Sequence, residues 1–255
     1  MGQSGQWLRF GSSSDMSKTI AIMQPTYLPW IGYFDLIDRV DAFVLLDSVQ
    51  FEKQSWQQRN RIRTARDLEW LTVPVLHSGH FGQLICATQL ATPGQFVKKH
   101  LRTIEMNYSR AEFFKDYFLE FSQAMSEAGA IGTLAGMNIY LLRFLLLKLG
   151  IATPLHVSSQ MGSQGKRSGL LVDICRSLDS SEYLSPPGSA EYLREDYPQF
   201  EEAGIHVWLH AYEHPAYHQL HKPFMPYACV LDLLFNEGPR ALQIIRSGRR
   251  DRSPL

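Results

Sequence analysis

The chain contains little cysteine, which limits the roles that its thiols can have. Its three cysteines, Cys86, Cys175 and Cys229, lie far apart, and none has the C-x-x-C spacing of redox or zinc sites. Three thiols cannot all pair with one another, and disulfides are rare in reducing compartments. We therefore expect reduced cysteines and a cytoplasmic protein.

The chain also lacks net charge and long apolar runs. Its 25 basic and 25 acidic residues cancel, so it has no general attraction to nucleic acid or anionic membranes. The longest apolar stretch, Ile139 to Leu149, is interrupted by charged residues and is well short of the roughly 20 residues that cross a bilayer. The expected partner is a small-molecule sugar or nucleotide, with no membrane insertion. The oligomeric state stays open.

Two common catalytic motifs are absent. The basic loop before Ser168 is not a Walker A loop, because Gln160 stands where that motif requires a glycine. Ser185 is not in a G-x-S-x-G elbow. The loop from Gly162 to Ser168 can still bind an anion if it opens a helix, since free N–H groups and the helix dipole point at one spot. Lys166 and Ser168 are therefore substrate-binding candidates, and an ordinary capped helix is the alternative.

A βαβ unit is predicted from Ile20 to Leu46. The β-branched run from Ile20 to Met23 indicates a strand, which Pro25 ends because proline cannot donate to the ladder. A helix is expected to begin near Pro29, since apolar side chains recur at helical spacing: Trp30, Phe34 and Ile37. Ala42 to Leu46 is apolar throughout, as expected of a strand covered on both faces.

Polar and aromatic side chains follow both strands of this unit. Ligands bind beyond the carboxyl ends of strands in open α/β sheets, so the loop 24–29 and the polar loop 47–63 are expected to line one crevice. Lys53, Arg59 and Arg61 can bind a phosphate or carboxylate there, and Trp56 can stack on a flat ring or a sugar face. Asp47 is a candidate proton acceptor. The substrate-binding candidates are Gln24, Tyr27, Gln50, Lys53, Trp56, Arg59 and Asn60.

The middle of the chain, about residues 94–150, has a helical pattern. The last of its helices, about 133–149, is almost wholly apolar and should stop at Gly150. Asn138 is polar within it and is a further substrate-binding candidate, with closure of the helix dipole or of an ion pair as the alternative. Strands are also expected at 70–76, 153–158, 182–184 and 205–209. The predicted fold class is α/β, a mainly parallel open sheet flanked by helices, with a helical middle segment.

A single domain is expected over residues 16–246. The Gly- and Ser-rich residues 1–15 are expected to be a disordered tail or the product of an upstream start, with Met16 as the alternative start. A terminal helix is predicted over 224–235, in which Asp232 is an ion-pair partner or a base. Residues 247–255 are expected to be a frayed basic tail.

Four histidines are spaced four apart, which on a helix would form a metal stripe: His206, His210, His214 and His218. The alternation of apolar residues here favours a strand instead, with the first two histidines on one exposed face. No metal site is therefore predicted, and the turn histidines His77 and His80 are expected to be solvated. His214 follows the strand and is the candidate general acid or base, with structural hydrogen bonding as the alternative. Tyr217 and Gln219 in the same loop are substrate-binding candidates.

Two groups of residues form a combined pattern that covers nearly the whole chain after Met16. The first is Gln24-Pro25, Tyr27, Pro29, Gly32-Tyr33-Phe34, Asp41, Asp47, Gln50-Phe51, Lys53, Trp56 and Arg59-Asn60. The second is Lys166-Arg167-Ser168, Tyr183, Tyr192, His214-Pro215, Tyr217, Gln219, Phe224, Asp232 and Asn236-Glu237-Gly238. Together they resemble the WbqC-like protein family. The resemblance implies bacterial surface-polysaccharide (O-antigen, lipopolysaccharide) biosynthesis and a glycine- or other acyl-transferring role.

Three functions are compatible with these observations. The first is a transferase that acts on a sugar or nucleotide-sugar intermediate, with Lys53, Arg59 and Lys166 binding its phosphate or carboxylate. The second is an ATP-using, nucleotidyltransferase-like enzyme, which requires the Gln24 loop and Lys166 to share one cavity. The third is a non-catalytic ligand-binding or assembly protein of the same pathway. No cofactor is fixed by the sequence, and ATP and a nucleotide sugar are the two candidates. Four residues on separate loops are expected to face one common hollow: Gln24, Arg59, Lys166 and His214.

Overall fold

The structure is a computed structural model that describes residues 17–76, 79 and 82–255. Within them, a six-stranded sheet has the order β5-β2-β1-β6-β7-β8. Neighbouring strands are parallel except β7 and β8. The strands are β1 (Thr19–Met23), β2 (Ala42–Leu45), β5 (Leu155–Val157), β6 (Glu182–Ser185), β7 (His206–Leu209) and β8 (Ser253–Pro254). The predicted α/β class is confirmed. The expected tail at 1–15 and the histidines His77 and His80 lie outside the described residues.

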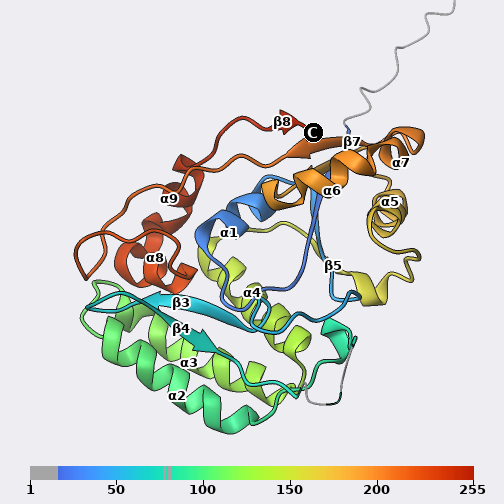
Figure 1. Cartoon of the computed structure of the whole chain (residues 1–255). Coiled ribbons are helices and arrows are strands. Elements are labelled where there is room, and N and C mark those ends of the chain that lie inside the picture. Colours follow the sequence, from blue (N-terminus) through green and yellow to red (C-terminus); the bar gives the residue numbers. More distant parts are fainter. Residues whose placement is uncertain (1–16, 77–78, 80–81) are drawn as a thin grey trace, which may run out of the picture.

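Helices cover both faces of this sheet (Figure 1). Alternate side chains of a strand point to opposite faces, so Ala21 and Ile22 of β1 belong to different cores. Ile22 packs in the core formed with α5 (Ser168–Ser177), α6 (Ala190–Glu195) and α7 (Tyr197–Glu202). Ala21 packs in the larger core, which contains α1 (Ile31–Asp38), α8 (Val230–Glu237) and α9 (Ala241–Ser247).

The helical middle segment joins the larger core. It comprises α2 (Pro93–Tyr108), α3 (Phe114–Ala130) and α4 (Leu134–Leu149). The side chain of Thr133 caps α4 by accepting from the backbone N–H of Gly136, and Gly150 ends the helix with φ +75°. Glycine adopts this left-handed conformation without steric cost, so the predicted stop is confirmed. Short 3-10 turns lie at Ile85–Ala87, Ser158–Gln160, Pro187–Ser189 and Gly238–Arg240.

A separate antiparallel hairpin crosses the helical segment. It consists of β3 (Arg59–Arg63) and β4 (Leu68–Thr72), and it lies beside α2 and α3 in Figure 1. Two expectations need correction here. The end of the segment 47–63 is a strand and not a loop, and the strand expected at 70–76 ends at Thr72, two residues before Pro74, which cannot donate to a ladder.

The carboxyl end of the chain is held to the sheet, which corrects the expectation of a frayed tail. Strand β8 pairs with β7, and four arginines near the end form ion pairs with carboxylates of distant elements. They are Arg246 with Asp38, Arg249 with Asp35 and Asp38, Arg250 with Glu213, and Arg252 with Glu182. These ion pairs could not be predicted from the sequence, because the partners lie far apart along the chain.

The carboxylate of Asp35 is fully buried and contacts His210, one of the four histidines that are spaced four apart. His210 Nε2 lies 2.8 Å from Asp35 Oδ2, and Arg249 Nε donates to Asp35 Oδ1 at 2.6 Å. His206 is exposed, whereas His210 is buried, so the expectation that both lie on an exposed face is wrong for His210. A buried carboxylate needs such partners.

None of the helices in the described part of the chain combines the length and the apolar character required to span a bilayer.

Candidate functional site

The order of the parallel strands creates a switch point beside β1. The chain adds β2 and then β5 on one side of β1, and later adds β6 and β7 on the other side. Loops that leave the carboxyl ends of β1 and β6 therefore diverge, and a crevice opens between them. Two cavities lie at this end of the sheet, and both are lined by residues that directly follow β1.

The first of them, which we call the polar cavity, has a volume of about 340 Å³. It brings together the loop after β1, the loop before β3 and the loop after β6. Glu52 supplies a carboxylate, and several amides and hydroxyls line the same space. The lining residues are Ile22, Met23, Gln24, Thr26, Leu46, Glu52, Ser55, Trp56, Gln57, Leu171, Tyr183, Pro186, Ser189 and Tyr192.

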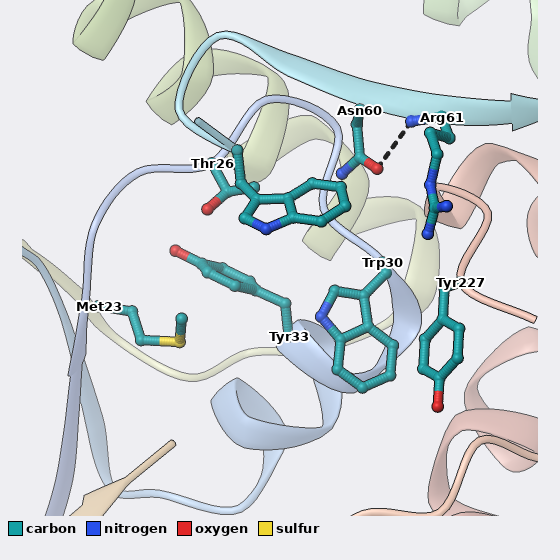
Figure 2. Close-up of a pocket in the computed structure, with 8 residues that line it drawn as sticks. Met23, Thr26, Trp30, Tyr33, Asn60, Arg61 and Tyr227 are labelled. Carbon is teal, nitrogen blue, oxygen red and sulfur yellow. Dashed lines mark hydrogen bonds between the residues drawn. The ribbon is translucent and has the colours of Figure 1, made fainter. Parts of the chain in front are cut away.

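The second, which we call the aromatic cavity, has a volume of about 210 Å³. Figure 2 shows Trp30 beside Tyr227, with the ring of Tyr33 between Trp30 and Met23. The ring centroids of Trp30 and Tyr227 are 5.5 Å apart. Arg61 is the charged residue in this lining, and the full set is Met23, Thr26, Trp30, Tyr33, Trp56, Asn60, Arg61 and Tyr227. Met23, Thr26 and Trp56 line both cavities, so the two form one bipartite cleft.

Buried amides hold the loops of the cleft in place. Gln57 Nε2 donates to Gln24 Oε1 at 2.8 Å, and Gln57 Oε1 accepts from the backbone N–H of Glu52 at 3.1 Å. Asn138 Nδ2 donates to the carbonyls of Pro25 (3.2 Å) and Gln57 (2.7 Å). Since these side chains join a helix and two loops, the shape of the polar cavity depends on them.

Comparison with known proteins places the chain in a family. The family model of the WbqC-like protein family matches residues 24–244. The chain belongs to the WbqC-like protein family. It is also 36% identical over 234 residues to the uncharacterised protein Rv1507c of Mycobacterium tuberculosis (strain ATCC 25618 / H37Rv), and the match covers 91% of this chain and 100% of that protein. No solved structure gives a significant match.

The WbqC-like chain brings some of its predicted site residues into the cleft. Gln24 lines the polar cavity, Asn60 lines the aromatic cavity, and Trp56 lines both. The indole of Trp56 is 49% exposed, so its face is open to a ligand. Asn60 is buried, and its Nδ2 donates to the carbonyls of Tyr27 and Leu28. Its amide therefore shapes the cavity wall.

Other predicted residues of the first segment lie outside the cleft lining. Tyr27 is fully buried, and its hydroxyl is 2.8 Å from Nδ1 of His100. Gln50 and Lys53 are exposed and line neither cavity. Arg59 lies on β3 with its guanidinium carbon 4.3 Å from the ring centroid of Trp70. The segment 47–63 enters the β3–β4 hairpin, so its side chains point in different directions.

Asp47 has a structural environment. Its Oδ1 accepts from the hydroxyl of Ser158 at 3.1 Å and from the backbone N–H of Ser159 at 2.9 Å, while Oδ2 accepts from the hydroxyl of Ser159 at 2.8 Å. The carboxylate is buried and caps the turn that follows β5. It would have to break these bonds to accept a proton from a substrate.

His214 lies beside the aromatic cavity, but both of its ring nitrogens are engaged. Nδ1 is 3.0 Å from the carbonyl oxygen of Pro215, and Nε2 accepts from the backbone N–H of Tyr227 at 3.1 Å. This pairing requires a neutral ring that carries its proton on Nδ1. Burial lowers the pKa of His214, against the opposing effect of the Pro215 carbonyl. The residue therefore positions Tyr227, whose φ is +68°.

Tyr217 and Gln219 form a buried group with Asp232. Tyr217 Oη and Gln219 Nε2 each donate to Asp232 Oδ2 at 2.7 Å. Burial raises the pKa of Asp232, although these donors and the nearby Arg63 oppose the shift. Gln219 also donates to the carbonyl of Met225 and accepts from its N–H. The group holds the loop that precedes α8, and none of its members lines the cleft.

The basic loop before α5 also lies outside the cleft lining. Ser168 is fully buried and donates to Asp196 Oδ2 at 2.7 Å, so its hydroxyl ties α5 to the junction between α6 and α7. Lys166 is exposed and lines neither cavity. The expectation that Gln24, Arg59, Lys166 and His214 share one hollow therefore differs from the observed arrangement.

The sequence did not single out most of the residues that build the cleft walls as site residues. They are Glu52, Gln57, Trp30, Tyr33, Tyr192 and Tyr227, whereas Arg61 was named only as a possible anion ligand. Glu52 and Gln57 lie inside the predicted segment 47–63, and their position there was the available signal. Tyr227 has no local signal, since its place depends on the distant His214. Among the described residues no group of three His, Cys, Asp or Glu side chains is arranged for a metal ion.

Proposed function

We propose that this WbqC-like protein is a transferase that acts on a sugar or nucleotide-sugar intermediate of bacterial surface-polysaccharide biosynthesis. The transferred group is glycine or another acyl group. The observation that supports the proposal is the bipartite cleft at the switch point, where an aromatic and a polar cavity meet at Trp56. A nucleotide sugar has the same two-part chemistry, a flat ring joined to a group rich in hydroxyls.

Each cavity suits one part of such a ligand. The rings of Trp30, Tyr33 and Tyr227 offer stacking and edge contacts to a base. Gln24, Gln57 and Ser189 offer donors and acceptors to sugar hydroxyls in the polar cavity. Arg61 can bind the phosphate that joins the two parts, because a guanidinium pairs well with phosphate.

Glu52 is the carboxylate that lines the polar cavity, and it is the candidate general base. In the transfer, a sugar hydroxyl or amine forms a bond to the acyl carbon of an activated donor. The bond from that carbon to the donor's leaving group breaks, and Glu52 accepts the proton of the attacking group. His214 and Asp47 would first have to give up hydrogen bonds that maintain the fold.

Non-catalytic ligand binding is the second candidate function. It is favoured by the same engagement of His214 and Asp47, because no nucleophile and base are hydrogen-bonded to each other in the cleft lining of the described residues. The ATP-using alternative requires Lys166 beside Gln24. Lys166 lies outside the lining of the polar cavity, so this alternative lacks its supporting observation.

A binding and turnover experiment separates these functions. Wild-type protein is titrated by calorimetry with nucleotide sugars and ATP, and the bound sugar is then incubated with acyl and aminoacyl donors and analysed by mass spectrometry. Trp56→Ala should weaken nucleotide-sugar binding about tenfold or more, whereas Leu119→Ala, on an exposed position of α3, should not. Glu52→Gln should bind normally and lose transfer. Binding without transfer in the wild type supports the non-catalytic function, and unchanged binding by Trp56→Ala contradicts the site.

A further inference from the structure

Two half-buried arginines and two exposed tryptophans lie together on the β3–β4 hairpin and in the loop just before it, on a surface that we call the Arg–Trp surface. Its members are Trp56, Arg59, Arg61 and Trp70. The indoles of Trp56 and Trp70 are 49% and 45% exposed, and their centroids are 5.3 Å apart. Two neighbouring indoles that are half exposed offer flat apolar faces on which a ligand can stack.

The strand alternation places both arginines on this face. Arg59 and Arg61 are two residues apart on β3, and Asn60 between them points inward and is buried. Arg61 is the register partner of Trp70 across the hairpin. The guanidinium of Arg61 lies 5.4 Å from the ring centroid of Trp70 and 5.7 Å from that of Trp56.

The two guanidinium groups lack acidic partners. Neither Arg59 nor Arg61 forms an ion pair with a carboxylate among the described residues. The Nε atoms of both are buried without a hydrogen-bond partner. By contrast, four arginines near the end of the chain are all paired. Two adjacent unpaired cations, fixed by stacking on indoles, are ready to bind anions.

The Arg–Trp surface joins the cleft to a second hollow. Trp56 lines both cavities of the cleft, while Trp70 lines a groove of about 640 Å³ between β4 and α2. This volume lies within the range of about 300–1,000 Å³ that is typical of ligand sites. The groove presents hydroxyl, amide and ammonium groups, together with the carboxylate of Glu69; the other polar residues are Thr72, Thr92, Gln95, Lys99 and Thr103. A ligand that leaves the cleft over Trp56 and Arg61 would meet Arg59 and Trp70, and then this groove.

We infer that the Arg–Trp surface binds an anionic oligosaccharide, the distal part of a chain whose terminal unit occupies the cleft. The inference rests on the proposed function and extends it to a polymer-linked substrate. Indole faces stack on sugar rings, guanidinium groups pair with carboxylates or phosphates of the chain, and the groove binds hydroxyls. A nucleic acid fits less well, because the chain has no net positive charge and few cations accompany the two arginines.

The test uses a tetrasaccharide of galacturonic acid as the anionic probe. Maltotetraose serves as the neutral probe, and a single-stranded oligonucleotide of similar length represents the competing class. Affinities are measured by calorimetry and by quenching of tryptophan fluorescence. The wild type should bind the uronate chain more tightly than either other probe, and Trp70→Ala and Arg59→Gln should each weaken that binding about tenfold. Arg66→Gln, an exposed arginine in the turn of the same hairpin, is the matched control and should bind like the wild type.

The same variants separate this inference from the proposed function. Arg59 lines neither cavity of the cleft, and its guanidinium lies over Trp70, so Arg59→Gln should bind a free nucleotide sugar as the wild type does. If the wild type binds no uronate chain, or if Trp70→Ala and Arg59→Gln bind it unchanged, the inference fails while nucleotide-sugar binding can stand. Tighter binding of the oligonucleotide also overturns it. Uronate binding without nucleotide-sugar binding leaves the inference standing and contradicts the function proposed for the cleft.

Discussion

Gln24 and Gln57 are joined by a hydrogen bond of 2.8 Å between their side-chain amides. The bond connects the loop after β1 with the loop before β3, and both residues line the polar cavity. Gln57 is buried while Gln24 is half-buried. An amide pair of this kind can form a rigid part of the cavity wall. Its other lone pairs and N–H groups stay available for hydrogen bonds to a ligand.

Gln57→Ala should make this part of the wall of the polar cavity less rigid. The change removes the partner of Gln24 and the acceptor of the Glu52 backbone N–H, and it should lower the free energy of unfolding by about 1–3 kcal/mol. Urea denaturation measures the loss, and calorimetry should show weaker ligand binding in parallel. Gln123→Ala, at an exposed position of α3, is the control. Equal stability of the two variants would contradict a structural role for Gln57.

Asn138→Ala should destabilise the protein, although the side chain of Asn138 does not itself line the cleft. The side chain supplies both hydrogen bonds to the buried loop carbonyls of Pro25 and Gln57, so its loss leaves two acceptors unpaired, and we expect a cost of about 2 kcal/mol or more. Asn107→Ala removes only a bond to the carbonyl of Thr103 one turn earlier and should cost less. A smaller loss for Asn138→Ala than for Asn107→Ala, measured by urea denaturation, would refute the role assigned to Asn138.

His100 should make stability depend on pH. Burial lowers the pKa of His100 to about 4 in the folded protein, against the opposing effect of the Thr72 backbone, whereas a histidine in the unfolded chain titrates near about 6.5. The unfolded state therefore binds the proton first, so stability is intact above the unfolded pKa and falls as the pH drops towards the folded pKa. Between about pH 7 and pH 5 the loss should be about 2 kcal/mol.

Urea denaturation at both pH values tests this. His100→Gln should be less stable at neutral pH because it loses the bond to Tyr27, but its stability should fall less on acidification. His206→Gln, at an exposed position of β7, should keep the pH dependence of the wild type. An unchanged slope in His100→Gln would show that other groups cause the dependence.

Two neighbouring arginines should differ in their effect on stability. Arg249 pairs with the fully buried Asp35, so Arg249→Gln should cost about 3 kcal/mol, because it leaves a buried carboxylate short of a partner. Arg250 pairs with the exposed Glu213, and Arg250→Gln should cost less than about 1 kcal/mol. Thermal and urea unfolding measure both. Similar losses for the two variants would mean that the end of the chain is not held by Asp35.

The fold was predictable where local sequence decides it. The apolar runs of β1 and β2 and the stop at Gly150 follow from residue types that act alone. The register of the hairpin and the attachment of the chain end depend on contacts such as Arg249 with Asp35, which no local pattern reports. The basic residues near the end of the chain therefore suggested a frayed tail, although ion pairs neutralise their charges.

The site was predictable by position more than by residue type. Gln24 and Trp56 follow strands of the predicted unit and do line the cleft. His214 and Asp47 have side chains suited to catalysis, but the directions of those side chains are set by the partners Tyr227 and Ser159. Sequence identifies the polar residues near a crevice, and packing decides which of them face it.

A crystal structure of the protein with a bound nucleotide sugar is the most direct test of the account. Ligand density is expected in the bipartite cleft, with the base among Trp30, Tyr33 and Tyr227 and the sugar beside Gln24 and Glu52. Density at the basic loop around Lys166, with the cleft empty, would contradict it.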